Sequence, residues 1–137
     1  MAIVVDVSAI VPLAFSDEDR ALAAAVVRTL ASEGGVVPSL FWFEIWNTLA
    51  MSERRDRSTP ENTQRFVALL AKLHLVVDPL PNAEQILLLT RRYGITAYDA
   101  AYLELALRTG SPLATKDKDL VKAIAAADGT LFAVEKS

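Results

Sequence analysis

The chain contains no cysteine and only one histidine, His74, among its 137 residues. The absence of cysteine excludes disulfide bonds, thiolate metal sites and a thiol nucleophile, and it is consistent with a reducing compartment. A single imidazole cannot form a histidine-based metal site by itself. His74 lies between two apolar segments, so we interpret it as structural rather than as a general base. Any metal site in this protein must therefore be built from oxygen ligands.

The sequence also lacks a long hydrophobic run and an excess of basic residues. No segment approaches the roughly 18 uninterrupted apolar residues of a membrane span. The apolar start, MAIVVDVSAIVPLAF, has no basic region and contains Asp6, so we expect no secretory signal, no membrane association and a cytoplasmic location. The formal net charge of −3 argues against a broad, nonspecific nucleic-acid surface. With 53% hydrophobic and 23% charged residues, the chain fits one globular domain over residues 1–137.

Short apolar runs rich in β-branched residues alternate with helical patterns along the whole chain. We expect strands at 3–6, 36–38, 75–79, 112–115 and 131–134, and helices at about 8–15, 19–32, 40–54, 60–73, 83–93, 97–109 and 118–127. Continuous apolar strands that alternate with helices are typical of a parallel sheet covered on both faces. The predicted fold is a three-layer α/β/α sandwich with a parallel sheet of about five strands.

Two aspartates fall where such a fold collects its ligands, beyond the carboxyl ends of the strands, and a third joins them if the loop before its helix brings the start of that helix over the same edge. Asp6 ends the first strand, Asp117 follows the fourth, and Asp99 lies in the first turn of the helix before that strand. Each has a local alternative, because Asp6 and Asp117 (or Asp119) can cap the helices that follow them. Asp99 can be the third residue of a capping box that starts at Thr96.

The position of Asp99 is unusual for a second reason. On a helix it shares an apolar stripe with Tyr102 and Leu103, whereas Glu104 and Arg108 lie toward the opposite side. A carboxylate on a stripe that faces the core is costly unless something pairs with it.

Glu44 is the fourth candidate, in the segment SLFWFEIWNTLA. Large apolar residues surround it, so it belongs either to a narrow solvated stripe or to a polar pocket in which Asn47 and Thr48 donate to it. Four carboxylates brought together disfavour one another unless a cation neutralises them. An all-oxygen site of this kind suits Mg²⁺ or Mn²⁺, which activate water for phosphodiester hydrolysis.

With Asp6, Glu44, Asp99 and Asp117 in this order, the sequence resembles the PIN-domain ribonucleases, specifically the VapC-type toxins of type II toxin–antitoxin systems. The segments that carry the resemblance are VVDVSAI, WFEIWNTL, TAYDAAYLELA and PLATKDKDL, and together they extend over nearly the whole chain. The resemblance implies a five-stranded parallel sheet and an acidic pocket that holds Mg²⁺ or Mn²⁺. It assigns Asp6, Glu44, Asp99 and Asp117 to metal binding and water activation, and Ser8 and Thr115 to supporting hydroxyls.

The resemblance also implies an RNA substrate, a homodimer and inhibition by a cognate antitoxin. Positive charge for RNA is available at Lys116, which flanks Asp117 and can reach a phosphate, and at 54–57, Arg91, Arg92, Lys118 and Lys122. Such charge runs usually form solvated surfaces, and the sequence shows no aromatic RNA-stacking motif between them. Phe41, Trp42, Phe43 and Trp46 belong either to the core or, in part, to a groove for an antitoxin helix.

Two other functions are compatible with parts of the sequence. A receiver-like phospho-acceptor domain would use Asp6 for Mg²⁺, Asp78 as the acceptor and Lys116 for the phosphate, but it leaves Glu44 and Asp99 without a role. A non-catalytic PIN-like interaction module is the second alternative, and the intact set of four acids argues against it.

Overall fold

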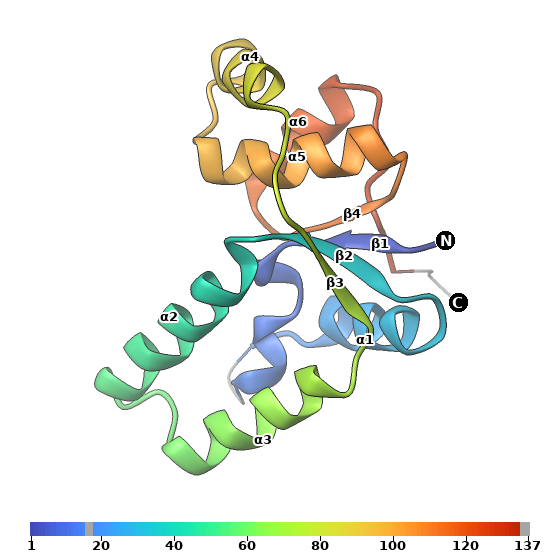
Figure 1. The fold of residues 1–137 in the computed structure, drawn as a ribbon. Helices are drawn as coiled ribbons and strands as arrows, with labels where there is room; N and C mark the ends of the chain where they lie inside the picture. Colours follow the sequence, from blue (N-terminus) through green and yellow to red (C-terminus); the bar gives the residue numbers. More distant parts are fainter. Residues whose placement is uncertain (16–17, 135–137) are drawn as a thin grey trace.

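The protein is a three-layer α/β/α sandwich (Figure 1), seen in a computed structural model that describes residues 1–15 and 18–134. The strands are β1 (Ile3–Val5), β2 (Gly35–Pro38), β3 (Leu75–Asp78) and β4 (Leu113–Ala114). The helices are α1 (Ala21–Glu33), α2 (Phe41–Arg54), α3 (Pro60–Ala71), α4 (Ala83–Tyr93), α5 (Ala97–Thr109) and α6 (Lys118–Ala126). Helices α1, α2 and α3 cover one face of the sheet, and α4, α5 and α6 lie on the other (Figure 1).

The sheet is parallel, with the strand order β3-β2-β1-β4. Its two inner strands, β1 and β2, are paired on both sides. The fifth strand that we expected at 131–134 is reduced to a single parallel bridge between Leu131 and Leu113. Beyond Leu131, the amide of Phe132 still donates to the carbonyl of Leu113, but Ala133 and Val134 are exposed. The fold class is confirmed, and the described part of the sheet has four strands.

The helix boundaries follow the local signals closely. Thr59, Asn82 and Thr96 each accept a hydrogen bond from the amide three residues later, so all three are N-caps. Helices α4 and α5 end at Gly94 and Gly110, which adopt the left-handed conformation that favours glycine. The helix expected at 8–15 was wrong in type. It is two 3₁₀ turns, η1 (Val7–Ala9) and η2 (Val11–Ala14), and Pro12 lies within the second turn, where its ring is tolerated.

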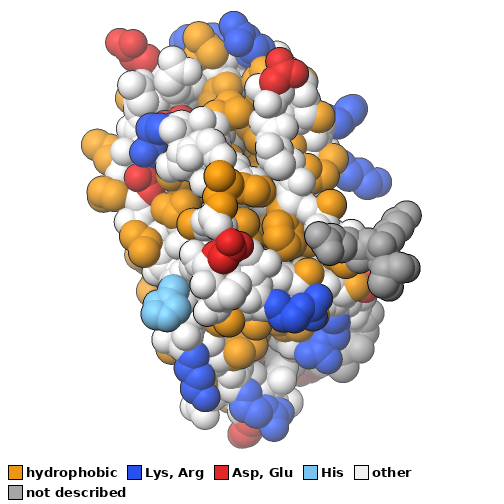
Figure 2. Space-filling view, turned by 90° about the vertical axis from the view of Figure 1, so that its right-hand side faces the viewer, with side chains coloured by type: hydrophobic (Ala, Val, Ile, Leu, Met, Phe, Trp, Pro, Cys, Tyr) orange, Lys and Arg blue, Asp and Glu red, His pale blue; other side chains and the backbone are white. Residues whose placement is uncertain are grey.

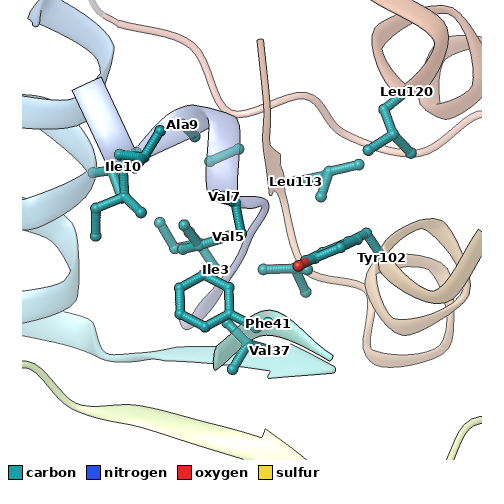
Figure 3. Packing of buried hydrophobic residues seen from close by; sticks show 14 of the residues in the cluster. Ile3, Val5, Val7, Ala9, Ile10, Val37, Phe41, Tyr102, Leu113 and Leu120 are labelled. Carbon is teal, nitrogen blue, oxygen red and sulfur yellow. The ribbon is translucent and has the colours of Figure 1, made fainter. Parts of the chain in front are cut away.

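The core packs against both faces of the sheet. Figure 3 shows Tyr102 entering from α5 and Phe41 from the start of α2, around the buried Val5 and Ile3 of β1. Helix α5 runs antiparallel to the strands and begins at the end of the sheet where β1 ends (Figure 1). The first turn of α5 and the carboxyl ends of β1 and β4 therefore meet at one edge.

The edge of the sheet at the amino ends of the strands has a different distribution of acidic side chains. Figure 2 shows the end of the molecule that carries the amino ends of the strands, and its acidic side chains are scattered among hydrophobic and basic ones. Among the described residues, no helix is long and apolar enough to cross a membrane.

Candidate metal centre

Asp6 is the most deeply placed acid at the carboxyl edge, with only 8% of its surface exposed. Its Oδ2 accepts hydrogen bonds from Ser8 Oγ at 2.6 Å and from Thr115 Oγ1 at 2.8 Å. Burial raises the pKa of Asp6 and outweighs the lowering effect of the two hydroxyls, and the charge of Asp117 raises it further. The side chain does not cap η1. Asp6 is therefore held by hydroxyls that follow two neighbouring strands, and a backbone hydrogen bond from Val7 also lowers its pKa.

Ser8 and Thr115, the two hydroxyl residues that the resemblance singled out, fix the geometry of this edge. The backbone amide of Lys116 donates to Ser8 Oγ at 2.8 Å, and the amide of Asp117 donates to Thr115 Oγ1 at 3.0 Å. The loop after β4 is thus attached to the loop after β1. Lys116 itself is exposed beside this junction.

Asp99 is part of a helix cap, but its carboxylate does not take part in it. Its backbone amide donates to Thr96 Oγ1 at 3.1 Å, as the capping box predicted. Within the described residues, however, the Asp99 carboxylate makes no hydrogen bond, so the reciprocal half of the box is absent. Partial burial, and after it the charges of Asp117, Asp6, Glu44 and Asp119, together raise the pKa of Asp99 to about 6. Capping therefore does not explain the carboxylate.

Asp117 caps α6 and also faces the other acids. Its Oδ1 accepts from the amides of Asp119 and Leu120 at 2.9 and 3.0 Å, which confirms the capping interpretation. One carboxylate oxygen each from Asp99, Asp117 and Asp119 lie within 4.8 Å of one another. Capping and metal binding are compatible here, because the two amides occupy only one of the two oxygens of Asp117.

Glu44 reaches the site from the opposite layer, on the first turn of α2. The hydroxyl of Tyr102, on α5, donates to Glu44 Oε1 at 2.6 Å. Partial burial raises the pKa of Glu44, the hydrogen bond from Tyr102 lowers it, and the charge of Asp6 raises it. Tyr102 is buried at 1% exposure, so a fixed hydroxyl orients the Glu44 carboxylate.

Two of the four predicted acids, Asp99 and Asp117, belong with Asp119 to the group of carboxylates within 4.8 Å of one another. Asp6 and Glu44 lie outside that group, but near enough for their charges to add to the effect of burial in raising the pKa of Asp99. Sequence reasoning missed two further residues. Asp119 had been considered only as a cap, although its position two residues after Asp117 in the first turn of α6 was the available signal. Tyr102 had been considered only as part of an apolar stripe. The predicted partner of Glu44, Asn47, is exposed and makes no hydrogen bond in the part of the chain that is described.

The donor set fits a hard divalent cation. Only oxygen ligands are present, and Asp6, Glu44 and Asp117 each use one carboxylate oxygen for a protein hydrogen bond. The remaining oxygens, with the carboxylates of Asp99 and Asp119, provide the ligands that Mg²⁺ and Mn²⁺ prefer. Positive charge would also relieve the repulsion that raises these pKa values.

Comparison with known proteins identifies the family of this chain. The family model for the PIN domain matches residues 3–126. Ribonuclease VapC3 from Pyrobaculum aerophilum is 31% identical over 128 residues, which cover 89% of this chain and 94% of that protein. The crystal structure of PAE2754 from P. aerophilum has a TM-score of 0.69 at 25% identity, covering 90% of this chain and 79% of that one. A toxin–antitoxin complex from Klebsiella pneumoniae shares the fold, with a TM-score of 0.65 at 17% identity and coverage of 96% and 97%.

The chain belongs to the PIN-domain family. Within that family it is of the VapC type. Family membership argues against the receiver-like alternative, and the structure adds a local reason. Asp78, the acceptor in that alternative, is paired with Arg108 at 2.7 Å instead of facing the other acids.

Proposed function

We propose that this protein is an Mg²⁺-dependent endoribonuclease and acts as the toxin of a toxin–antitoxin pair. The observation that carries the proposal is the group of Asp99, Asp117 and Asp119 carboxylates within 4.8 Å at one edge of a PIN-type sheet, with Asp6 and Glu44 near enough for their charges to act on Asp99. Similarity to Ribonuclease VapC3 over nearly the full length supports RNA as the substrate. The non-catalytic alternative does not account for a costly cluster of carboxylates that no protein cation neutralises among the described ion pairs.

The position of each residue in the site suggests its role in the proposed reaction. Asp6, Asp99 and Asp117 would hold the cation, with Asp119 as an additional ligand, and Glu44 would accept the proton of the attacking water. A bound Mg²⁺ or Mn²⁺ would supply an activated water and stabilise charge on the phosphate. Ser8 and Thr115 keep Asp6 oriented, and Tyr102 does the same for Glu44. No covalent nucleophile is needed.

The proposal includes an antitoxin partner, a homodimer and a cytoplasmic location. Phe41 is fully buried, but Phe43 and Trp46 on the same helix are 70% and 50% exposed. Trp42 and Trp46 line an apolar hollow of about 350 Å³ with Val67 and Ala71 of α3. Exposed apolar surface of this kind is typical of protein interaction sites, which is consistent with a protein partner.

The purified protein is expected to cleave RNA with Mg²⁺ or Mn²⁺ and to lose this activity in EDTA. The same ions should raise its melting temperature. At a metal concentration about 100 times Kd, the stabilisation is about 2.7 kcal/mol, or roughly 8–10 °C for a chain of this size. Gel analysis of RNA fragments and a thermal melt measure both effects. Cleavage that persists in EDTA, or a melt insensitive to both ions, would contradict the proposal.

Tyr102→Phe tests the orientation of Glu44. The change removes the hydroxyl that donates to Glu44 Oε1 and leaves the buried ring in place. We expect kcat to fall roughly tenfold, since each 1.36 kcal/mol of lost positioning is a factor of ten. KM and the Mg²⁺-induced rise in melting temperature should change little. Tyr98→Phe, on the same helix but 67% exposed, is the matched control. An equal loss of kcat in both variants would argue against the role of Tyr102.

A further inference from the structure

A hollow of about 210 Å³ adjoins the acidic cluster. Tyr93, at the end of α4, forms one wall, and the residues on α6 that line it are Asp119, Lys122, Ala123 and Ala126. Asp119 belongs to both features, because its carboxylate lies within 4.8 Å of those of Asp99 and Asp117. A group seated in the hollow is therefore next to whatever binds at the candidate metal centre.

The two larger side chains of the hollow have complementary properties. Tyr93 is partly buried and packs on the core, so its ring is held in place while one side lines the hollow. Lys122 is exposed and forms no ion pair in residues 1–15 and 18–134. The small side chains of Ala123 and Ala126 leave the hollow open between Tyr93 and Lys122. A flat aromatic surface beside an ammonium group is the combination that binds a base and its phosphate in single-stranded nucleic acids.

Further basic residues lie close to Tyr93 and to Asp117 in the sequence, although the hollow itself is lined by Asp119 as well as Lys122. Arg91 and Arg92 precede Tyr93 and are exposed, and Lys116 and Lys118 are exposed on either side of Asp117. The sequence showed these basic residues but no aromatic residue between them. The fold supplies one, because it packs the end of α4 beside α6 and places Tyr93 next to Lys122.

We propose that the hollow between Tyr93 and Lys122 binds the RNA nucleotide adjacent to the scissile phosphate. The base stacks on the Tyr93 ring, and its phosphate lies at the Lys122 ammonium. This inference rests on the proposed ribonuclease function and names residues that bind its substrate. Lys122 supplies a positive charge beside the acids, where a protein of net charge −3 needs one to hold a polyanion.

Binding is tested without cleavage in an Asp99→Asn background, with a fluorescently labelled random 20-nucleotide single-stranded RNA. Lys122→Ala should weaken binding several-fold and reduce the slope of log K against log salt by about 0.7, the effect of one lost phosphate contact. Lys72→Ala, at the exposed end of α3, is the matched control and should change neither the RNA affinity nor its dependence on salt. Tyr93→Leu, which keeps apolar packing, should weaken binding at least about fivefold, and Tyr93→Phe should bind like the parent.

Steady-state cleavage by the otherwise wild-type enzyme separates substrate binding from other roles. Lys122→Ala and Tyr93→Leu should raise KM, with kcat and the Mg²⁺-induced melting shift retained. If Lys122→Ala instead alters the Mg²⁺ response and leaves KM unchanged, Lys122 only balances the acidic charge and the inference is wrong. Equal effects of Lys122→Ala and Lys72→Ala would overturn it as well. A wild-type protein that cleaves no RNA would instead overturn the proposed function itself.

Discussion

Asp99→Asn is expected to lower Mg²⁺-dependent RNA cleavage by at least about 10³-fold while the protein remains folded. The substitution keeps the shape of the side chain and the amide that donates to Thr96, so α5 retains its cap. What it removes is the negative charge of a carboxylate whose pKa is raised by partial burial and by four acidic neighbours and which we propose as a metal ligand. A loss of about 4 kcal/mol of transition-state stabilisation, the order expected for metal-mediated charge stabilisation, corresponds to this factor.

The same variant should be more stable than the wild type when no metal is present. In the metal-free protein the Asp99 charge is unfavourable, because partial burial and its acidic neighbours raise the pKa of this carboxyl to about 6. Neutral asparagine removes that repulsion, so the melting temperature in EDTA should rise by a few degrees, the effect of about 1 kcal/mol. Saturating Mg²⁺ should reverse the order of the two proteins, because only the wild type retains the full ligand set.

Asp56→Asn is the matched control, because Asp56 is exposed after the end of α2 and its positive φ of 58° suits asparagine. It should cleave RNA at the wild-type rate and show the wild-type metal response. Wild-type cleavage by Asp99→Asn would remove Asp99 from the mechanism. A lower melting temperature of Asp99→Asn in EDTA would mean that its carboxylate stabilises the fold, contrary to the metal-centre interpretation.

The strand pattern and the family resemblance together pointed to the acids of the candidate centre. Parallel strands place their carboxyl ends at one edge, so Asp6 and Asp117 were expected near one another once the strands were identified. The position of Asp99 depended on the loop between α4 and α5, which the sequence permitted to reach that edge but did not fix. Glu44 was harder to assign, because it belongs to the helix layer on the other side of the sheet. Its partner was wrong in the prediction because the donor, Tyr102, comes from α5, and such a contact has no signature in local spacing.

In helix α5, the helical periodicity of the sequence did not predict correctly which residues are buried. The pattern placed Glu104 on the polar side of the helix, yet Glu104 is only 3% exposed. Helix α4 packs along α5, so the side of α5 that faces away from the sheet is covered by a second helix in the same layer. A helix covered on two sides has little amphipathic pattern, and a single sequence does not show which charged residue will be buried.

Arg108→Met is expected to destabilise the protein by about 3 kcal/mol, since it leaves the buried carboxylate of Glu104 without its partner. Arg108 Nε donates to Glu104 Oε1 at 2.6 Å, and Nη2 and Nη1 donate to the two oxygens of Asp78 at 2.7 and 3.3 Å. These interactions fasten the end of β3 to α5. Methionine keeps much of the apolar volume of the arginine side chain, so the loss reports on charge. Urea unfolding measures it.

The double variant Glu104→Leu/Arg108→Met should recover much of that loss, because it also removes the buried Glu104 carboxylate that the single change leaves unpaired. The control is Arg91→Met, which changes an exposed arginine near the end of α4. Its free energy of unfolding should lie within about 0.5 kcal/mol of the wild-type value.

The result that would contradict this expectation follows from a hollow of about 300 Å³ that borders Glu104 and Arg108. If water enters this hollow and solvates the Glu104 carboxylate, Arg108→Met will hardly change the free energy of unfolding, and the double variant will be no more stable than the single one. A large loss that the second substitution restores would instead show that the cost comes from the buried, unpaired Glu104 carboxylate, and that the Arg108–Asp78 pair at the end of β3, absent from both variants, contributes little.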